Sequence, residues 1–338
     1  FVIATGSRPF VPPIPGLDGV PYLTNETIFA LRDRPDHLIV LGGGPIGMEM
    51  AQAHRRLGCQ VTVIEAARAL GREDPELAAV VLQALRDEGV QIIEGQAATR
   101  ITGAAGAITV TLADGQAITG THLLVAVGRK VTLDGLGLDA ANVAHTPKGV
   151  TVGDDLRSAT NRRVYALGDV AGGAQFTHLA GYHAGVAIRS ILFGLPARAS
   201  LRAIPRATYT DPEIAHVGLT EAEARARFGN RLTVTRFPFH DNDRAQAQGE
   251  TRGLVKLMIV KGRPVGASIV GPHAGELLAP WCLAVSQRLK LSAVAGAVLP
   301  YPTLAETGKR AAGAYFSPQL FANPWVKRVV RLVQRLLP

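Results

Sequence analysis

Short apolar runs alternate with helical patterns through the first 130 residues. Leu38–Leu41 is a continuous apolar run of strand length, and a helical pattern follows from Met48 to Leu57, with Met48, Ala51 and Leu57 on its apolar side. Val61–Ile64 is a second apolar run. A strand, a helix and a strand in this order predict an α/β fold with a parallel sheet.

Three glycines lie between the first strand and the helix. Gly42, Gly44 and Gly47 have the G-x-G-x-x-G spacing, which permits a sharp turn, close approach of a pyrophosphate and tight packing of the helix on the strand. Glu65 ends the second strand, where its carboxylate can accept hydrogen bonds from both adenine-ribose hydroxyls. The alternative is a glycine-rich turn that binds nothing, but the complete pattern favours a dinucleotide site.

Further elements follow in this part of the chain. Asp74 starts a second helix that ends at Gly89. Three more strands are predicted at Val90–Ile93, Ile108–Leu112 and His122–Val127, with Asp114-Gly115 as a hairpin turn between the last two.

A second strand end carries a carboxylate. Val164–Leu167 is a buried strand in the stretch from Thr160 to Asp169, and its end presents Asp169. Carboxylates at such ends commonly bind ribose or ribityl hydroxyls. The next helix, from about His178 to Phe193, directs its N-terminus to the same region.

Residues 201–316 have an α+β pattern, and Thr220 with Glu223 forms a capping box. Strands are predicted at Ala207–Tyr209, His216-Val217, Leu232–Phe237, Leu254–Ile259 and Ala267–Val270, and helices at Thr220–Phe228 and Gly275–Arg288.

Composition narrows the function classes. Hydrophobic residues make up 47% and charged residues 19%, as in a globular protein. No uncharged run reaches the roughly 18–20 residues that span a bilayer, and no signal peptide is visible. Cys59 and Cys282 lie far apart, which argues against a disulfide framework or a zinc site and favours a reducing, cytoplasmic setting. The net charge is +9, but no basic patch interleaved with aromatic residues occurs in the sequence, so we expect no nucleic-acid partner.

Six motifs occur in one order along the chain. They are Ile3-Ala4-Thr5-Gly6-Ser7, Gly42 to Glu49, Gly128-Arg129, Thr160 to Asp169, Tyr209-Thr210-Asp211-Pro212-Glu213, and Pro300-Tyr301-Pro302-Thr303-Leu304-Ala305-Glu306. The chain up to about Phe316 resembles the class I pyridine nucleotide–disulfide oxidoreductases, the family of dihydrolipoamide dehydrogenase, glutathione reductase and mercuric reductase.

The resemblance implies a division into domains. Residues 1–17 end the first segment of an FAD-binding domain, into which a Rossmann-like NAD(P)-binding domain is inserted at 18–129. Residues 130–200 form the second FAD-binding segment, and 201–316 an α+β dimerisation domain. Residues 317–338 are an amphipathic basic tail.

The resemblance also implies residue roles. Asp169 matches the aspartate that holds the FAD ribityl chain, and the turn from His178 to Ala180 matches the helix start that faces the flavin pyrimidine ring. The remaining matched residues toward the cofactors are Thr5, Gly6, Gly168 and Arg129; for Arg129 a solvated side chain is the alternative. Glu49 matches a glutamate that pairs with a lysine near the flavin, and its alternative is a surface ion pair.

The choice of nicotinamide follows from charge. Related enzymes that use NADPH tend to carry arginine where this chain has Glu65, because the 2′-phosphate needs cations. A carboxylate there repels the phosphate, so NAD is expected. Arg68 and Arg72 lie shortly downstream, and they leave NADP as the alternative.

Tyr301 departs from the family pattern. Disulfide reductases usually carry histidine here, paired with the glutamate that matches Glu306, to move protons to and from the dithiol. Tyrosine has an ordinary pKa of about 10, against about 6.5 for histidine, and is a poor base at neutral pH. Mercuric reductases also carry tyrosine here, but they end in a cysteine pair that this sequence lacks. A packed interface aromatic is the alternative for Tyr301.

His240, Asp241 and Asp243 lie close together in the sequence. We expect them to form a solvated loop and not a metal site.

Two functions are compatible with the sequence. The first is an FAD-dependent NAD(P)H oxidoreductase that passes hydride from nicotinamide to flavin and on to a disulfide or other acceptor, as a homodimer whose Tyr301 and Glu306 reach the partner's flavin. The family's first G-x-G-x-x-G and its C-x-x-x-x-C are not among these residues, so the second is a non-catalytic NAD-binding and dimerisation fragment.

The tail has a pattern of its own. Trp325–Leu337 predicts an amphipathic helix with four cations, Lys327, Arg328, Arg331 and Arg335, mostly on one side. One interpretation is a terminal helix packed on the dimerisation domain. The other is peripheral attachment to an anionic membrane surface.

Overall fold

The computed structural model describes residues 1–336. Its contacts divide the chain into two compact units. The first unit consists of Phe1–Ala69 and Gly89–Leu201, and the second of Leu70–Glu88 and the residues from Arg202 onward. The helix that follows Glu65 in sequence thus belongs to the same unit as the C-terminal part of the chain. Within residues 1–336, no helix is both long and apolar enough to cross a membrane.

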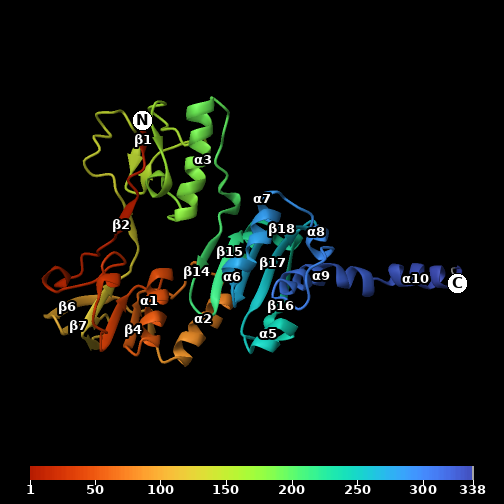
Figure 1. The fold of residues 1–338 in the computed structure, drawn as a ribbon, viewed down its shortest axis with the longest axis horizontal. Coiled ribbons are helices and arrows are strands. Elements are labelled where there is room, and N and C mark those ends of the chain that lie inside the picture. Colours follow the sequence, from red (N-terminus) through yellow and green to blue (C-terminus); the bar gives the residue numbers. More distant parts are fainter. Residues whose placement is uncertain (337–338) are drawn as a thin grey trace. The chain divides into compact units, whose positions relative to one another are not determined.

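A four-stranded parallel sheet dominates the first part of the first unit (Figure 1). Its strand order is β5 (Gln91–Glu94), β4 (Gln60–Glu65), β3 (His37–Leu41) and β9 (His122–Val125). Helix α1 (Pro45–Arg56) follows β3. Met48 and Ala51 are fully buried as expected, but Leu57 is 67% exposed, because α1 ends at Arg56 and the chain turns through Gly58 with a φ of +93°.

Between β5 and β9 in the sequence, the chain forms an antiparallel sheet of three strands: β6 (Ala98–Ala104), β7 (Ala107–Leu112) and β8 (Ala117–Gly120). Asp114-Gly115 is a hairpin turn, but the predicted partner strand was wrong: the turn joins β7 to β8. The segment expected as the partner forms β9, in parallel register with β3, with Leu38 opposite His122. Four successive buried residues of β3 need a neighbour on each side, which explains this pairing.

Several two-stranded pairs complete the first unit. β1 (Val2–Ile3) pairs in parallel with β13 (Tyr165–Ala166), and β2 (Ser7–Pro9) pairs antiparallel with β10 (Arg129–Val131). β11 (His145–Thr146) pairs with β12 (Gly149–Val150). Helix α3 (Thr177–Phe193) follows the 3₁₀ turn Gly168–Ala171. Segments from both ends of this unit's sequence therefore meet in these pairs.

The second unit is built on a five-stranded antiparallel sheet. Its strand order is β14 (Arg206–Thr208), β15 (Glu213–Gly218), β18 (Arg263–Gly271), β17 (Leu254–Val260) and β16 (Leu232–Pro238). The helices are α2 (Pro75–Asp87), α4 (Glu221–Phe228), α5 (Asp243–Gln248), α6 (Ala274–Leu277), α7 (Ala279–Ser286), α8 (Leu291–Ala295), α9 (Glu306–Phe321) and α10 (Pro324–Leu336). The core of this unit contains the fully buried Phe239 and Trp281.

Some predicted helices differ in detail. The capping box of Thr220 and Glu223 is confirmed at the start of α4. The single helix expected over Gly275–Arg288 is two short helices, α6 and α7, which join at Leu278. Helix α9 contains Pro318. Leu337, the last residue of the predicted tail helix, lies outside the described residues.

A buried lysine joins α2 to the sheet of the second unit. Lys256 on β17 has a side chain only 3% exposed. Its Nζ lies 2.8 Å from Asp74 Oδ2, 2.8 Å from Glu76 Oε2 and 2.6 Å from Glu221 Oε2. We call Asp74, Glu76, Glu221 and Lys256 the lysine cluster. Burial lowers the pKa of Lys256, but its three carboxylate partners outweigh this and raise that pKa above its ordinary value.

Candidate functional site

The glycine loop after β3 is shaped by the absence of side chains. A Cβ on Gly47 would lie 1.9 Å from the carbonyl oxygen of Gly42, so only glycine lets α1 pack this closely on the turn. Gly42 has a φ of +105°, and a Cβ there would lie 2.5 Å from the carbonyl oxygen of Ala126. A Cβ on Gly44, in contrast, would meet nothing within 4 Å. The loop thus leaves open space at the one glycine where a pyrophosphate is expected to approach.

Among the described residues, no side chain accepts a hydrogen bond from the first N–H groups of α1. Pro45 occupies the first helical position, no side chain caps the helix N-terminus and no acidic residue lies in its first turn. Such an end carries unpaired N–H groups and a partial positive charge, which favour an anion. The geometry of this end suits a phosphate group.

Glu65 forms a hydrogen bond to the same loop. Its Oε2 accepts a hydrogen bond from the backbone N–H of Gly43 at 2.7 Å, and its Oε1 accepts one from the N–H of Ala67 at 2.9 Å. The carboxylate therefore lies at the end of β4 beside the glycine loop. Each carboxylate oxygen has a further lone pair, so these two bonds leave capacity for ligand hydroxyls. The sequence did not indicate this bracing contact.

A second cluster forms where β1 and β2 meet the segments that follow the parallel sheet. Ser7 Oγ donates to Asp169 Oδ2 at 2.5 Å, although the two residues lie 162 positions apart. Arg129 donates to the same serine through Nε to Oγ at 2.7 Å and through Nη2 to the carbonyl oxygen at 2.6 Å. Arg129 is thus not a solvated side chain but part of a chain of contacts, Arg129–Ser7–Asp169, that the sequence analysis missed at Ser7.

Thr5 and Gly6 lie next to this chain of contacts. Thr5 Oγ1 donates to the carbonyl oxygen of Thr132 at 2.7 Å, and the carbonyl of Gly6 accepts from the Thr132 N–H at 3.0 Å. Gly6 has a φ of +65°, and a Cβ there would meet nothing within 4 Å. The crossing from β1 to β2 is therefore held by contacts with the backbone of Thr132 and leaves space at Gly6.

Gly168 brings Asp169 up against α3. Its φ is +67°, and a Cβ on it would lie 3.0 Å from the Cβ of Ala180, so the strand end packs tightly on the first turn of the helix. No side chain caps the N-terminus of α3, which begins after Phe176. The ring of Phe176 stacks on that of His178 with centroids 5.1 Å apart. Asp169, His178 and Ala180 are thereby gathered at one helix N-terminus, where negative charge is stabilised.

His183 lies behind this strand end. It is 3% exposed, and its Nδ1 accepts a hydrogen bond from the Gly168 N–H at 3.2 Å. Burial lowers the pKa of the imidazole, so the ring is neutral at pH 7 and carries its proton on Nε2. That Nε2 is buried without a hydrogen-bond partner among residues 1–336. An unpaired buried donor is costly, and it marks a place where a group outside these residues fits.

Glu49 lies on α1, two residues after Gly47, and is half-buried. It has an interaction partner, so it is not a free surface carboxylate. Its pairing with a lysine near the flavin stays a prediction.

Tyr301 is held by a carboxylate. Its hydroxyl donates to Asp243 Oδ2 at 2.8 Å, while its side chain remains 68% exposed. The hydrogen bond to Asp243, followed by the charge of that carboxylate and that of Glu306, raises the pKa of the phenol above its ordinary value. Tyr301 is therefore neutral at pH 7 and is not buried within its own chain, and packing at a dimer interface stays the alternative. Asp243, expected in a solvated loop, was missed as its partner.

Glu306 and Asn242 frame the same segment. Glu306 is the first residue of α9. Asn242 is buried, and its Nδ2 donates to the carbonyl oxygen of Thr303 at 3.1 Å while its Oδ1 accepts from the Ala245 N–H at 2.9 Å. This asparagine ties the start of α5, which carries Asp243, to the Tyr301 segment. Within residues 1–336, no group of His, Cys, Asp or Glu has the arrangement to hold a metal ion.

The structure thus sorts the predicted residues into three groups. The glycine loop group contains Gly42, Gly44, Gly47, Glu49 and Glu65. The second group contains Thr5, Gly6, Arg129, Gly168, Asp169, His178 and Ala180. Tyr301 and Glu306 form the third, in the second unit.

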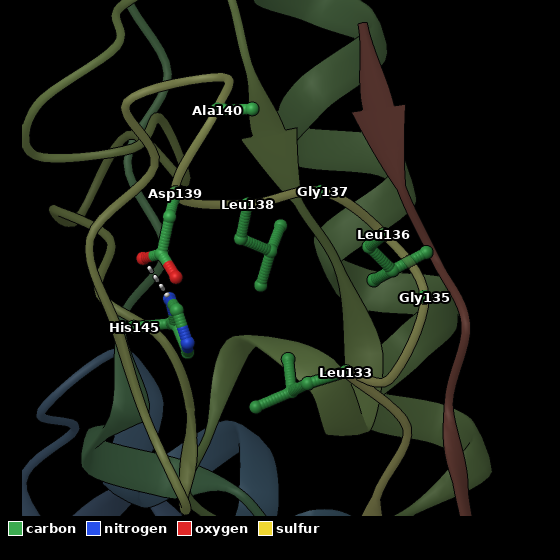
Figure 2. A pocket seen from close by; sticks show the side chains of 8 residues that line it. All are labelled: Leu133, Gly135, Leu136, Gly137, Leu138, Asp139, Ala140 and His145. Carbon is green, nitrogen blue, oxygen red and sulfur yellow. Dashed lines mark ion pairs between the residues drawn. The ribbon is translucent and has the colours of Figure 1, made fainter.

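One pocket lies apart from these groups. It has a volume of about 220 Å³ and is lined by Leu133, by residues 135–140 and by His145. Figure 2 shows Asp139 facing His145 across its rim, with Nδ1 and Oδ1 4.0 Å apart. The volume is below the about 300 Å³ at the lower end of ligand pockets, and no predicted site residue lines it. It is not a candidate site.

Comparison with known proteins places these groups in a family. Residues 1–184 match the family model "pyridine nucleotide-disulphide oxidoreductase", and residues 204–312 match the dimerisation domain of the same family. A mercuric reductase of Streptomyces lividans is 36% identical over 322 residues, which cover 94% of this chain and 68% of that protein. A dihydrolipoyl dehydrogenase of Bacillus subtilis is 34% identical over 90% of this chain and 67% of its own.

A further relative is much longer than this chain, and solved structures have a similar fold. A mercuric reductase of Bacillus cereus is 36% identical over 90% of this chain, which spans 49% of that protein, about half its length. LpdA from Mycobacterium tuberculosis has a TM-score of 0.86 at 29% identity, covering 93% of this chain and 69% of that one. RclA, an HOCl-induced flavoprotein disulfide reductase from Escherichia coli, has a TM-score of 0.84 at 29% identity, covering 92% and 72%. The chain belongs to the pyridine nucleotide-disulphide oxidoreductase family, with the α/β fold and the dimerisation domain of that family.

Proposed function

We propose that this chain acts in a flavin-dependent oxidoreductase that takes hydride from NAD(P)H and passes electrons to a disulfide or another acceptor. The observation that carries the proposal is the hydrogen bond between Ser7 and Asp169. It joins the two segments that flank the glycine-loop fold into one site. Family membership supports the same conclusion, since the relatives include flavoprotein reductases.

The second group of residues fits FAD. Asp169 would hold ribityl hydroxyls, Thr5 and Gly6 would border the cofactor, and the uncapped start of α3 at His178 and Ala180 would face the flavin ring. The unpaired Nε2–H of His183 supports this fit, because a cofactor or the segment that holds it would supply an acceptor. The chemistry that FAD supplies when bound is two-electron transfer between a reduced nicotinamide and an acceptor. The protein's part is to hold the cofactor and to stabilise negative charge at the helix N-terminus.

The glycine loop would bind the nicotinamide nucleotide. Gly44 and the start of α1 would receive the pyrophosphate, and Glu65 would accept hydrogen bonds from the adenine ribose. We propose NADH as the preferred donor, because the Glu65 carboxylate would repel a 2′-phosphate. Arg68, an exposed cation three residues on, is the feature that would favour NADPH instead.

The domain assignment follows from these roles. We propose that residues 1–17 and 130–200 form the FAD-binding part, residues 18–129 the NAD(P)-binding part and residues 201–316 the dimerisation part. A homodimer is proposed through the last of these, supported by the dimerisation-domain match at 204–312. Tyr301 and Glu306 would then act at the partner's flavin. The raised pKa keeps the proton on Tyr301 at pH 7, so its hydroxyl would act there as a hydrogen-bond donor and not as a base.

Flavin retention tests the proposal. Asp169→Asn keeps the shape of the side chain but removes its charge, and Asp139→Asn is the matched control at a carboxylate 98% exposed. In the full-length protein, we expect Asp169→Asn to lose bound FAD during purification, and Asp139→Asn to retain it as wild type does. Full-length protein that contains no flavin and binds none when FAD is supplied would refute the proposal and favour a nucleotide-binding and dimerisation module.

A further inference from the structure

The last helix of the chain separates apolar and basic residues completely. In α10, apolar residues recur at positions 325, 329, 332, 333 and 336, a spacing that places them on one face, and Val326 and Val330 widen that face. The remaining positions after Pro324 are polar: Lys327, Arg328, Arg331, Gln334 and Arg335. One face is therefore wholly apolar and the opposite face wholly basic or polar.

Residues 1–336 do not cover the apolar face of α10. None of the side chains of Pro324–Leu336 is buried. Trp325 is 72% exposed, Leu332 is 58% and Leu336 is 71%. Phe321, just before the helix, is also 71% exposed. The structure thus does not support the interpretation that this helix packs on the dimerisation fold of its own chain.

The helix is well formed at its start and lies beyond the residues that match the dimerisation domain. Asn323 Oδ1 accepts from the Trp325 N–H at 3.0 Å, and Pro324 occupies the first position of α10. The dimerisation-domain match ends at residue 312, before α10 begins. The helix thus lies beyond the matched dimerisation domain, and its exposed face is not part of that match.

The charge of this region has one sign. No acidic residue follows Glu306 in the sequence, whereas Lys309, Arg310 and the four cations of α10 do. A second copy of α10 would offer no carboxylate to these cations. Anionic lipid headgroups would, and the acyl chains beneath them would accept the apolar face.

We propose that α10 binds the surface of a membrane containing anionic lipid and attaches the protein there peripherally. The helix has 13 residues and is about 20 Å long, shorter than the roughly 30 Å of a bilayer core, so it lies in the interface and does not span it. Trp325 sits at headgroup level with Val329 and Val333 beneath it, and the four cations face the headgroups.

Vesicle flotation of the full-length protein tests this. The probes are vesicles of phosphatidylcholine alone and vesicles of phosphatidylcholine mixed with phosphatidylglycerol, at low and high salt. One variant replaces Lys327, Arg328, Arg331 and Arg335 with glutamine. Its matched control replaces four exposed cations elsewhere in the second unit with glutamine: Arg202, Arg227, Lys261 and Lys290. The two variants lose the same charge, so they separate a local effect from a general one.

We expect wild type and the control to float with the anionic vesicles at low salt and to be released at high salt. The α10 charge variant should bind more than about a hundredfold more weakly, since each cation near the surface contributes about fivefold. Val329→Glu with Val333→Glu should abolish flotation while leaving the unfolding transition unchanged, because both side chains are exposed. A blue shift of Trp325 fluorescence on vesicle addition, absent in Trp325→Phe, would support insertion.

Three results would overturn the proposal. Wild type could fail to float with anionic vesicles at low salt. The α10 charge variant and its control could bind equally. Removal of residues after Phe321 could change the sedimentation of lipid-free protein without affecting flotation, which would assign the apolar face to a second copy of the chain. None of these results depends on flavin or nucleotide binding, so they leave the proposed redox function untouched.

Discussion

Replacing Lys256 with methionine tests how the lysine cluster stabilises the second unit. Methionine keeps the apolar stem and removes the charge, and it leaves Asp74, whose side chain is 4% exposed, without its buried cation. Breaking a buried ion pair by removing one partner costs about 3–5 kcal/mol, because the remaining charge stays desolvated. We therefore expect the free energy of unfolding of this unit to fall by about 3–5 kcal/mol.

The same cluster makes the stability of the second unit depend on pH in the acid range. Burial alone would raise the pKa of Glu221, but hydrogen bonds from Lys256 and Arg225 lower it to about 2. The carboxylate thus titrates lower in the folded than in the unfolded chain, where its pKa is about 4.5. Its contribution is complete above pH 4.5 and is lost as the pH falls toward 2, and the shift corresponds to about 3 kcal/mol. Lys256→Met should flatten this part of the stability–pH curve.

Tryptophan fluorescence during urea unfolding measures both effects. The chain has two tryptophans, and Trp281 is buried in the core of the second unit, so a Trp325→Phe background reports on that unit alone. Arg252→Met is the control, since its pair with Asp87 is exposed and we expect a much smaller loss of stability. Asp74→Asn added to Lys256→Met should recover part of the loss. A loss below about 1 kcal/mol for Lys256→Met would refute the reasoning.

Three further predictions concern the redox function in the full-length protein. Glu65→Arg should shift the ratio of kcat/KM toward NADPH by about tenfold or more, whereas wild type that already prefers NADPH would contradict the charge argument. Turnover of dihydrolipoamide or glutathione disulfide should be poor and should rise in Tyr301→His, because histidine takes a thiol proton near neutral pH; high wild-type turnover would show that Tyr301 does not limit the chemistry. The flavin-loaded protein should sediment as a dimer, for which we expect an interface above roughly 2,000 Å², and a monomer would exclude the shared site.

Local features were predictable from the sequence because their causes lie within a few residues. The glycine spacing after an apolar run indicated the turn from β3 to α1, and Gly42 and Gly47 are each in a position that admits no Cβ. The Thr220–Glu223 capping box likewise depends on neighbours three residues apart. The carboxylate of Glu65 was found because it ends an apolar strand, and that of Asp169 because it lies in the turn that closely follows one.

Pairing across the chain was harder to predict. Strand β6 was missed because Ile101 is its only large apolar residue. Strand β9 pairs with β3 within the parallel sheet and not with the strand before the nearest turn, so its partner was not evident from the local sequence. Ser7 and Asp243 have no distinguishing local pattern; their partners lie 162 and 58 positions away. A lysine in a strand is ordinarily placed in solvent, and only the approach of α2 and α4 to β17 explains the burial of Lys256.

Anaerobic reduction of the full-length protein by NADH tests the central claim most directly. The visible absorbance of bound flavin is followed while NADH is added in small steps without oxygen, and Gly44→Val, which fills the open position of the glycine loop, is measured beside it. We predict that NADH bleaches the flavin of wild type and that Gly44→Val retains its flavin but requires far more NADH. Flavin that stays oxidised in the presence of excess NADH and NADPH would contradict the account.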